Sequence, residues 1–182
     1  MINKLYLPYF QNQNSMKRIL LLTVIICFSN TLKAQDYSND VKSTDAIVKA
    51  LYDVISGESK APRDWNRFRN LFKPESKLIP TRKTETNDFT LKALSPEEYI
   101  QIFTSRVTTG FFERELHNKT EAYGTIAHVF STYETTEVKG GPVTNRGINS
   151  IQLFKDKERY YIVNIFWCAE SMGFPLPNQY LK

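Results

Sequence analysis

Cysteine, histidine and glycine are scarce in this sequence. Its 182 residues contain two cysteines, Cys27 and Cys168, two histidines, His117 and His128, and seven glycines. No glycine-rich phosphate loop, HExxH motif, GxSxG turn or cluster of cysteines and histidines occurs. The sequence therefore offers no motif of the nucleotide-binding, zinc-peptidase or serine-hydrolase classes, and we expect no metal and no cofactor.

Acidic residues are missing from the N-terminal segment. Residues 1–35 contain four of the 24 basic residues and none of the 19 acidic ones, so the net charge of +5 is concentrated there. The remainder is nearly neutral and has no basic patch with interleaved aromatics, which argues against a nucleic-acid partner.

The same segment has the organisation of a secretory signal. From Met16 two basic residues precede an apolar run over 19–28, a polar stretch and Ala34 before Gln35. The apolar run is too short for a stable membrane span. We therefore expect translation to start at Met16, cleavage near Ala34/Gln35, and a periplasmic or secreted product with no membrane span after signal removal.

These signals divide the chain into a signal region, 1–35, and one domain, 36–182. A lipoprotein signal at Cys27 is the less favoured alternative, because bulky Ile26 precedes it. Cys168 is then the only cysteine of the domain and cannot form an intramolecular disulfide. We expect it to be a small buried hydrophobe in a core for which the 41% hydrophobic content suffices.

Three segments have the spacing of amphipathic helices. The first begins at Ser43 or Thr44 and ends at Gly57, and the second carries Trp65, Phe68 and Phe72 on one side until Pro74 stops it. The third has Ser95 as cap with a glutamate three residues later, and its expected inward residues are Tyr99, Ile102 and Phe103.

Strand patterns dominate the second half. Residues 146–154 and 160–168 are densely apolar, as in strands buried on both faces, and a charged turn joins them. Two further strands carry His117 and His128 and are joined near 122–124, whereas 77–89 has the composition of an edge strand and a connection.

The order RGINSIQL, YYIVNIFWCAE and PLPNQYL, preceded by FFERELH and AYGTIAHVFSTYE, resembles a bacterial exported branch of the nuclear transport factor 2-like (SnoaL-like) superfamily over residues 44–181. The resemblance implies an α+β, cystatin-like cone: a strongly curved antiparallel sheet packed on three N-terminal helices, with a pocket at the wide end. It also implies a homodimer through the sheet face. It implies no particular activity.

The residues that could carry chemistry lie on the two histidine strands. Glu113 and Glu115 share the face of His117 by the strand period of two. A two-residue turn near 122–124 would add His128 to this face, and a three-residue turn would place it opposite. The result is a possible glutamate–histidine acid–base site with His128, Glu113 and His117 as weak catalytic candidates, or else an ordinary solvated strand surface.

Two functions remain open from the sequence. The favoured one is an exported domain that binds a small apolar molecule. The alternative is an enzyme of the isomerase, dehydratase or polyketide-cyclase kind that uses His128 with a carboxylate. The expected pocket lining is the same for both: Trp65, Tyr99, Phe103, His128, Phe130 and Trp167.

Overall fold

The computed structural model describes residues 35–181 of the chain, of which 36 onward form one compact unit. The expected signal region lies almost wholly outside the described residues and stays a prediction. No helix among the residues described is long and apolar enough to cross a membrane.

The order of elements confirms an α+β fold. Helices α2 and α3 precede β1 and β2, α4 follows, and four long strands complete the chain, with three short 3-10 helices besides. The bounds are η1 Ser38–Val41, α2 Thr44–Ile55, α3 Trp65–Asn70, β1 Phe72–Lys83, β2 Phe89–Leu91, α4 Pro96–Arg106, β3 Phe112–Tyr123, β4 Ile126–Thr136, β5 Val143–Asp156, β6 Arg159–Ala169, η2 Glu170–Met172 and η3 Asn178–Tyr180.

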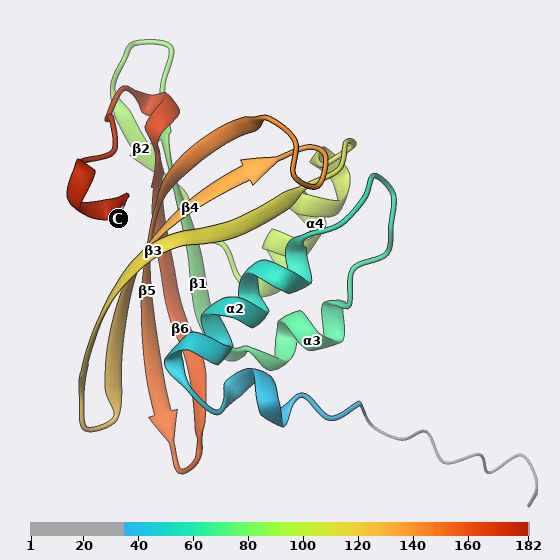
Figure 1. Cartoon of the computed structure of the whole chain (residues 1–182), viewed down its shortest axis with the longest axis vertical. Helices are drawn as coiled ribbons and strands as arrows, with labels where there is room; N and C mark the ends of the chain where they lie inside the picture. The colour runs from blue at the N-terminus through green and yellow to red at the C-terminus, as the bar shows by residue number, and fades with distance from the viewer. Residues whose placement is uncertain (1–34, 182) are drawn as a thin grey trace, which may run out of the picture. The chain divides into compact units, whose positions relative to one another are not determined.

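The six strands form one sheet in the order β2-β1-β6-β5-β4-β3. Every neighbouring pair is antiparallel except β1 and β6, so the sheet is mixed and not wholly antiparallel as expected. Figure 1 shows the sheet curving around the three α-helices, which lie on its inner side, while the C-terminal tail lies on its outer side. The expected cone is confirmed.

Helix α2 fills most of the inner side. Ser43 caps it by accepting a hydrogen bond from the backbone N–H of Ala46, and Ile47, Leu51 and Ile55 recur on its buried stripe. After the helix, Gly57 exchanges two backbone hydrogen bonds with Phe111, which ties the helix end to the start of β3.

Helix α3 is shorter than the pattern predicted. It ends at Asn70, and Phe72 and Pro74 already belong to β1. The backbone carbonyl of Leu71 accepts a hydrogen bond from the N–H of Ile162 on β6, so sheet pairing replaces the next helical turn. Pro74 is tolerated because the β1–β6 register is interrupted between Phe72 and Lys77.

Helix α4 begins as predicted. Ser95 Oγ accepts a hydrogen bond from the N–H of Glu98, whose carboxylate accepts one in return from the N–H of Ser95. Its buried residues include Ile100 and Phe103, whereas Ile102, which we expected to face inward, is partly exposed. The helix brings Tyr99 and Phe103 over the inner face of the sheet.

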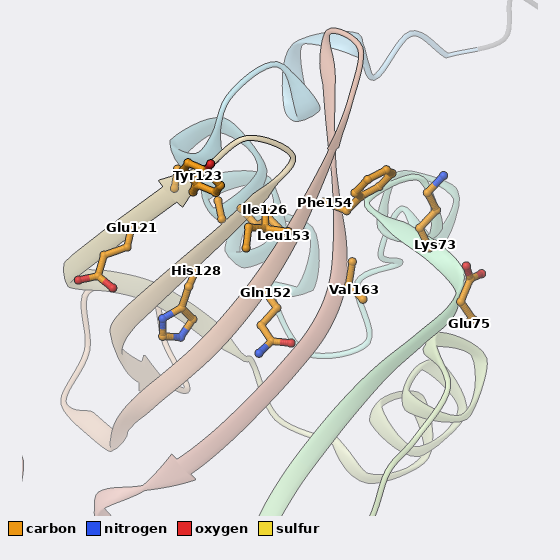
Figure 2. Close-up of a pocket in the computed structure, with 12 residues that line it drawn as sticks. Lys73, Glu75, Glu121, Tyr123, Ile126, His128, Gln152, Leu153, Phe154 and Val163 are labelled. Carbon is orange, nitrogen blue, oxygen red and sulfur yellow. The ribbon is translucent and has the colours of Figure 1, made fainter.

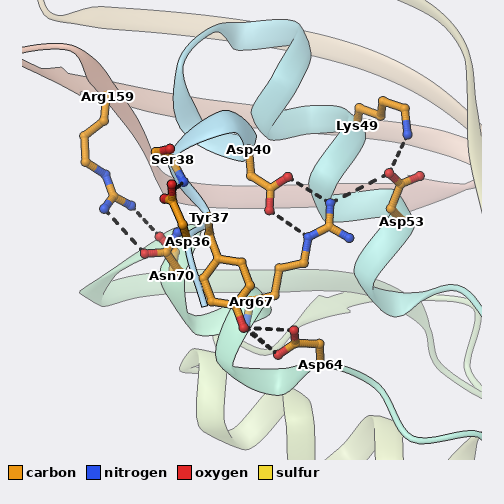
Figure 3. Close-up of polar contacts among 10 residues, drawn as sticks. All are labelled: Asp36, Tyr37, Ser38, Asp40, Lys49, Asp53, Asp64, Arg67, Asn70 and Arg159. Carbon is orange, nitrogen blue, oxygen red and sulfur yellow. Dashed lines mark hydrogen bonds and ion pairs between the residues drawn. The ribbon is translucent and has the colours of Figure 1, made fainter. Parts of the chain in front are cut away.

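Polar contacts fasten the first described residues to α3. Arg67 donates two hydrogen bonds to the Asp40 carboxylate, and the Tyr37 hydroxyl contacts both oxygens of Asp64 (Figure 3). The Arg67 and Asp40 side chains are largely shielded from solvent, so their paired hydrogen bonds hold η1 in place. The folded domain thus begins within a few residues of Gln35.

The capping box of α4 gives a test of how much the fold depends on helix ends. Ser95→Ala removes the side-chain acceptor for the N–H of Glu98 and should lower the free energy of unfolding by about 0.5–2 kcal/mol. Ser105→Ala, in the last turn of the same helix, removes only an exposed bond to the carbonyl of Ile102 and is the matched control. Urea denaturation measures both; equal effects would contradict the capping role.

Candidate functional site

A cavity of about 240 Å³ lies between the inner face of the sheet and the helices. Its walls are mainly aromatic and aliphatic, with a few polar groups. The lining residues are Leu51, Ile55, Leu78, Tyr99, Phe103, Val107, Phe111, Glu113, Tyr133, Thr135, Asn145, Asn149, Ile165 and Trp167.

Glu113 is the only ionisable carboxyl group among the lining residues. Strand β3 directs it inward, since its register partner Thr135 is buried on the inner face of β4. The residue as a whole keeps partial exposure, but the burial of its carboxyl raises the pKa from about 4.5 to about 8. No cation among the described residues pairs with it. At neutral pH the carboxyl is therefore mostly protonated and can donate a hydrogen bond.

Two phenols share the cavity with this carboxyl. Burial raises the pKa of Tyr99 and of Tyr133, and a negative charge on Glu113 would raise both further. Neither hydroxyl has a hydrogen-bond partner within the described part of the chain. Gly147 makes the room for Tyr133, because a Cβ at Gly147 would lie 2.6 Å from the Tyr133 hydroxyl oxygen.

Half of the expected pocket lining is found in the cavity. Tyr99, Phe103 and Trp167 line it, as does the weak catalytic candidate Glu113. Trp65 does not; it packs edge-on against Phe103, with ring centroids 5.6 Å apart, and supports the wall from behind.

His128 and Phe130 lie on the outer face of the sheet, so the expectation that they line the pocket is wrong. Their inward neighbours on β4, Val129 and Ser131, are buried. The His128 Nε2 atom is 2.8 Å from the Ser150 hydroxyl, and the Phe130 ring packs on Tyr180 of the tail. Figure 2 shows His128 on the outer groove.

This outer groove, of about 860 Å³, is more open than the inner cavity. It lies at the end of the sheet that carries the turn between β3 and β4. The residues that line it are Lys73, Glu75, Glu121, Ala122, Tyr123, Ile126, Ala127, His128, Gln152, Leu153, Phe154 and Val163 (Figure 2).

His117 also lies on the outer face, away from Glu113. The turn between β3 and β4 has two central residues, Gly124 and Thr125, so His117 does share a face with His128. A register shift between Glu115 and His117 then leaves one extra residue in β3. The strand period is broken there, and the expected glutamate–histidine site does not form.

Glu115 stays on the inner side of this bulge but does not reach the cavity. Its carboxylate accepts hydrogen bonds from the Ser131 hydroxyl and the Asn118 side-chain amide. Among residues 35–181 no group of three or more histidine, cysteine, aspartate and glutamate side chains is placed to hold a metal ion.

No protein-family model matches the sequence, and the comparison with curated proteins found no match. Solved structures do match. A protein of unknown function with a cystatin-like fold from Nostoc punctiforme aligns with a TM-score of 0.52 and 11% identity, over 68% of this chain and 85% of its own. LinA aligns with a TM-score of 0.50 and 7% identity, over 85% of this chain and 89% of its own.

The chain has a cystatin-like fold. A structure described as a candidate ketosteroid isomerase from Parabacteroides distasonis also aligns, with a TM-score of 0.48 and 9% identity, over 71% of this chain and 94% of its own. At such identities the similarity shows the fold alone. The chemistry of this domain must be argued from its own cavity.

The raised pKa of Glu113 predicts how stability depends on pH. Between pH 4.5 and 8 the folded domain keeps a proton that the unfolded chain has released, so stability falls as the pH rises through this window. Glu113→Gln cannot ionise and should lack this slope. The difference in the free energy of unfolding between the two proteins should change by roughly 2–4 kcal/mol across the window. This is less than the full free-energy equivalent of the pKa shift, because Glu113 keeps partial exposure to solvent.

Urea denaturation at half-unit steps from pH 4 to 9 measures this difference. All other titrating groups are common to both proteins and cancel. Parallel curves for the wild type and the variant would show that the Glu113 carboxyl is not desolvated.

Proposed function

We propose that this chain is an exported domain that binds a small, neutral, mainly apolar molecule in the inner cavity. The observation that carries the proposal is the position of Glu113, a carboxyl with a pKa of about 8 among aromatic side chains. A neutral carboxyl is a hydrogen-bond donor that can recognise a carbonyl oxygen. Apolar walls with a few converging polar groups are typical of small-molecule sites.

The two phenols strengthen the preference for an oxygen acceptor. The hydroxyls of Tyr99 and Tyr133 are free of protein partners among the described residues, so both can donate to a ligand. At about 240 Å³ the cavity is smaller than the roughly 300–1,000 Å³ typical of drug-sized ligands. We therefore expect a compact ring compound and not an extended chain.

The cyclic ketone cyclohexanone is a suitable probe, because it presents one carbonyl on an apolar ring. We expect it to shift the NMR signals of Phe103, Glu113 and Trp167 at pH 6.5. Its affinity should fall about tenfold or more by pH 9.5, since ionised Glu113 would face the carbonyl oxygen with a second acceptor.

Glu113→Gln keeps a donor and should bind the ketone with little dependence on pH. Ser150→Ala, on the outer face, should behave like the wild type. Signals that shift only at the outer groove, or none that shift at all, would overturn the proposal for a carbonyl ligand in the inner cavity.

A second candidate, proton transfer, is favoured by the same pKa. A carboxyl that titrates near neutrality is suited to remove and return a proton beside a carbonyl, with a phenol donating to the developing enolate oxygen. Here the catalytic group would be Glu113 in place of His128. In D₂O the wild type would then exchange the α-hydrogens of cyclohexanone for deuterium, and Glu113→Gln would not; binding without exchange leaves the domain a binding protein.

The outer face of the sheet supports a further proposal, a homodimer. Val163 and Phe166 on β6 are 37% and 39% exposed, and Ile126 at the end of β4 is 63% exposed. Apolar side chains gathered on one sheet face are typical of protein–protein contacts. A second copy of the chain would bury them through a two-fold interface.

Analytical ultracentrifugation tests this proposal. Phe166→Glu places a charge on the face and should raise the dimer dissociation constant by at least about tenfold. Val138→Glu is the control, because Val138 is also exposed but lies outside the sheet face, between β4 and β5. A monomeric wild type, or equal effects of both variants, would contradict the proposed interface.

A further inference from the structure

A chain of four polar side chains runs through the buried inner face of the sheet. Asn149 Nδ2 is 3.0 Å from the Tyr52 hydroxyl oxygen, which is 2.7 Å from Ser131 Oγ, which is in turn 2.5 Å from Glu115 Oε1. Asn149, Tyr52 and Ser131 are 6%, 3% and 0% exposed. Because the chain is buried, each bond in it depends on the one before.

The carboxylate at one end fixes the direction of every bond. A carboxylate only accepts, so the single proton of the Ser131 hydroxyl is donated to Glu115. The Ser131 oxygen must then accept a hydrogen bond from the Tyr52 hydroxyl. Tyr52 has no second proton to give, so it can only accept from Asn149, and the atom of Asn149 that faces it must be the amide nitrogen.

The direction of the chain also fixes the other end of the Asn149 side chain. With Nδ2 committed to Tyr52, the carbonyl oxygen Oδ1 cannot exchange places with it without leaving two acceptors in contact. Oδ1 accepts no hydrogen bond from the described residues, is not among the fully buried unpaired atoms, and belongs to a residue that lines the inner cavity. The cavity therefore presents a fixed acceptor in addition to its donors.

We infer that Asn149 selects ligands that carry an N–H or O–H donor as well as a carbonyl oxygen, and that the Glu115–Ser131–Tyr52 chain enforces this selection. The inference rests on the proposed function. The selection by Asn149 narrows the ligand class from simple ketones to lactams, which are cyclic amides, and hydroxy ketones. A ligand without the donor leaves Oδ1 unpaired in a buried site, and one with it does not.

A pair of six-membered rings tests the inference. Cyclohexanone and 2-piperidone both carry a carbonyl, but only 2-piperidone has an N–H. Their dissociation constants are measured by NMR titration at pH 6.5 with the wild type and with Ser131→Ala, which breaks the chain and lets Tyr52 donate to Asn149 instead. The preference for 2-piperidone over cyclohexanone should fall about tenfold in the variant.

Two further variants separate this effect from a general loss of packing. Tyr52→Phe interrupts the chain at another point and should reduce the preference in the same way, even if Ser131→Ala folds poorly. Ser150→Ala is the matched control: it removes a serine hydroxyl from the adjacent strand on the outer face, where it contacts His128, and should leave the preference unchanged.

The outcomes distinguish this inference from the function on which it rests. If both rings bind but the preference is the same in the wild type, Ser131→Ala and Tyr52→Phe, the selection by Asn149 is overturned and the binding cavity stands. If neither ring binds at the cavity, the proposed function is overturned and the selection with it.

Discussion

One unpaired residue in β3 decides which side chains reach the cavity. Glu115 pairs with Tyr133 and His117 with Thr132, so Leu116 has no partner of its own. Before this bulge the odd-numbered residues of β3 face the helices, and after it they face outward. The bulge places Glu113 in the cavity and His117 on the opposite side. The acid–base character of the site follows from this irregularity.

The cavity keeps polar groups that a well-packed apolar core would not contain. Glu113 loses the hydration of its carboxyl, and Tyr133 stands in a space that only a glycine at position 147 allows, since an added Cβ would also lie 2.4 Å from the Cys168 carbonyl oxygen. Such groups lower stability when they have no partners. In contrast, the Tyr52 hydroxyl nearby is satisfied by Asn149 Nδ2 and Ser131 Oγ. The unpaired groups converge on the cavity, where a ligand can pair with them.

The sequence was sufficient for the fold because helix caps, apolar spacing and dense strands agree with one another. It was sufficient for Tyr99 and Phe103, which recur at helical spacing on α4, and for Trp167, which lies in a densely apolar strand. It failed for β4, where Ala127 and Val129 alternate with His128 and Phe130 and both faces therefore look buried. Tyr133 was missed for the same reason. The sequence signal that could have found it is the pair of smaller residues Ser131 and Thr135, two positions away on the same face of the strand, which leave space beside it. The bulge at Leu116 could not be predicted, because the sequence around it contains no glycine or proline.

The charge of the cavity also bears on what it can hold. A cationic ligand would pair with ionised Glu113, but both charges would lose their hydration, at several kcal/mol for each ion, and only good geometry with further hydrogen bonds would recover that cost. The neighbouring phenols of Tyr99 and Tyr133 can donate to the carboxylate but give a cation only one acceptor each. A neutral ligand meets a protonated carboxyl with no ion to desolvate. Its carbonyl can accept a hydrogen bond from the Glu113 carboxyl and its own donor can satisfy Asn149 Oδ1, so these two groups are paired without a buried charge.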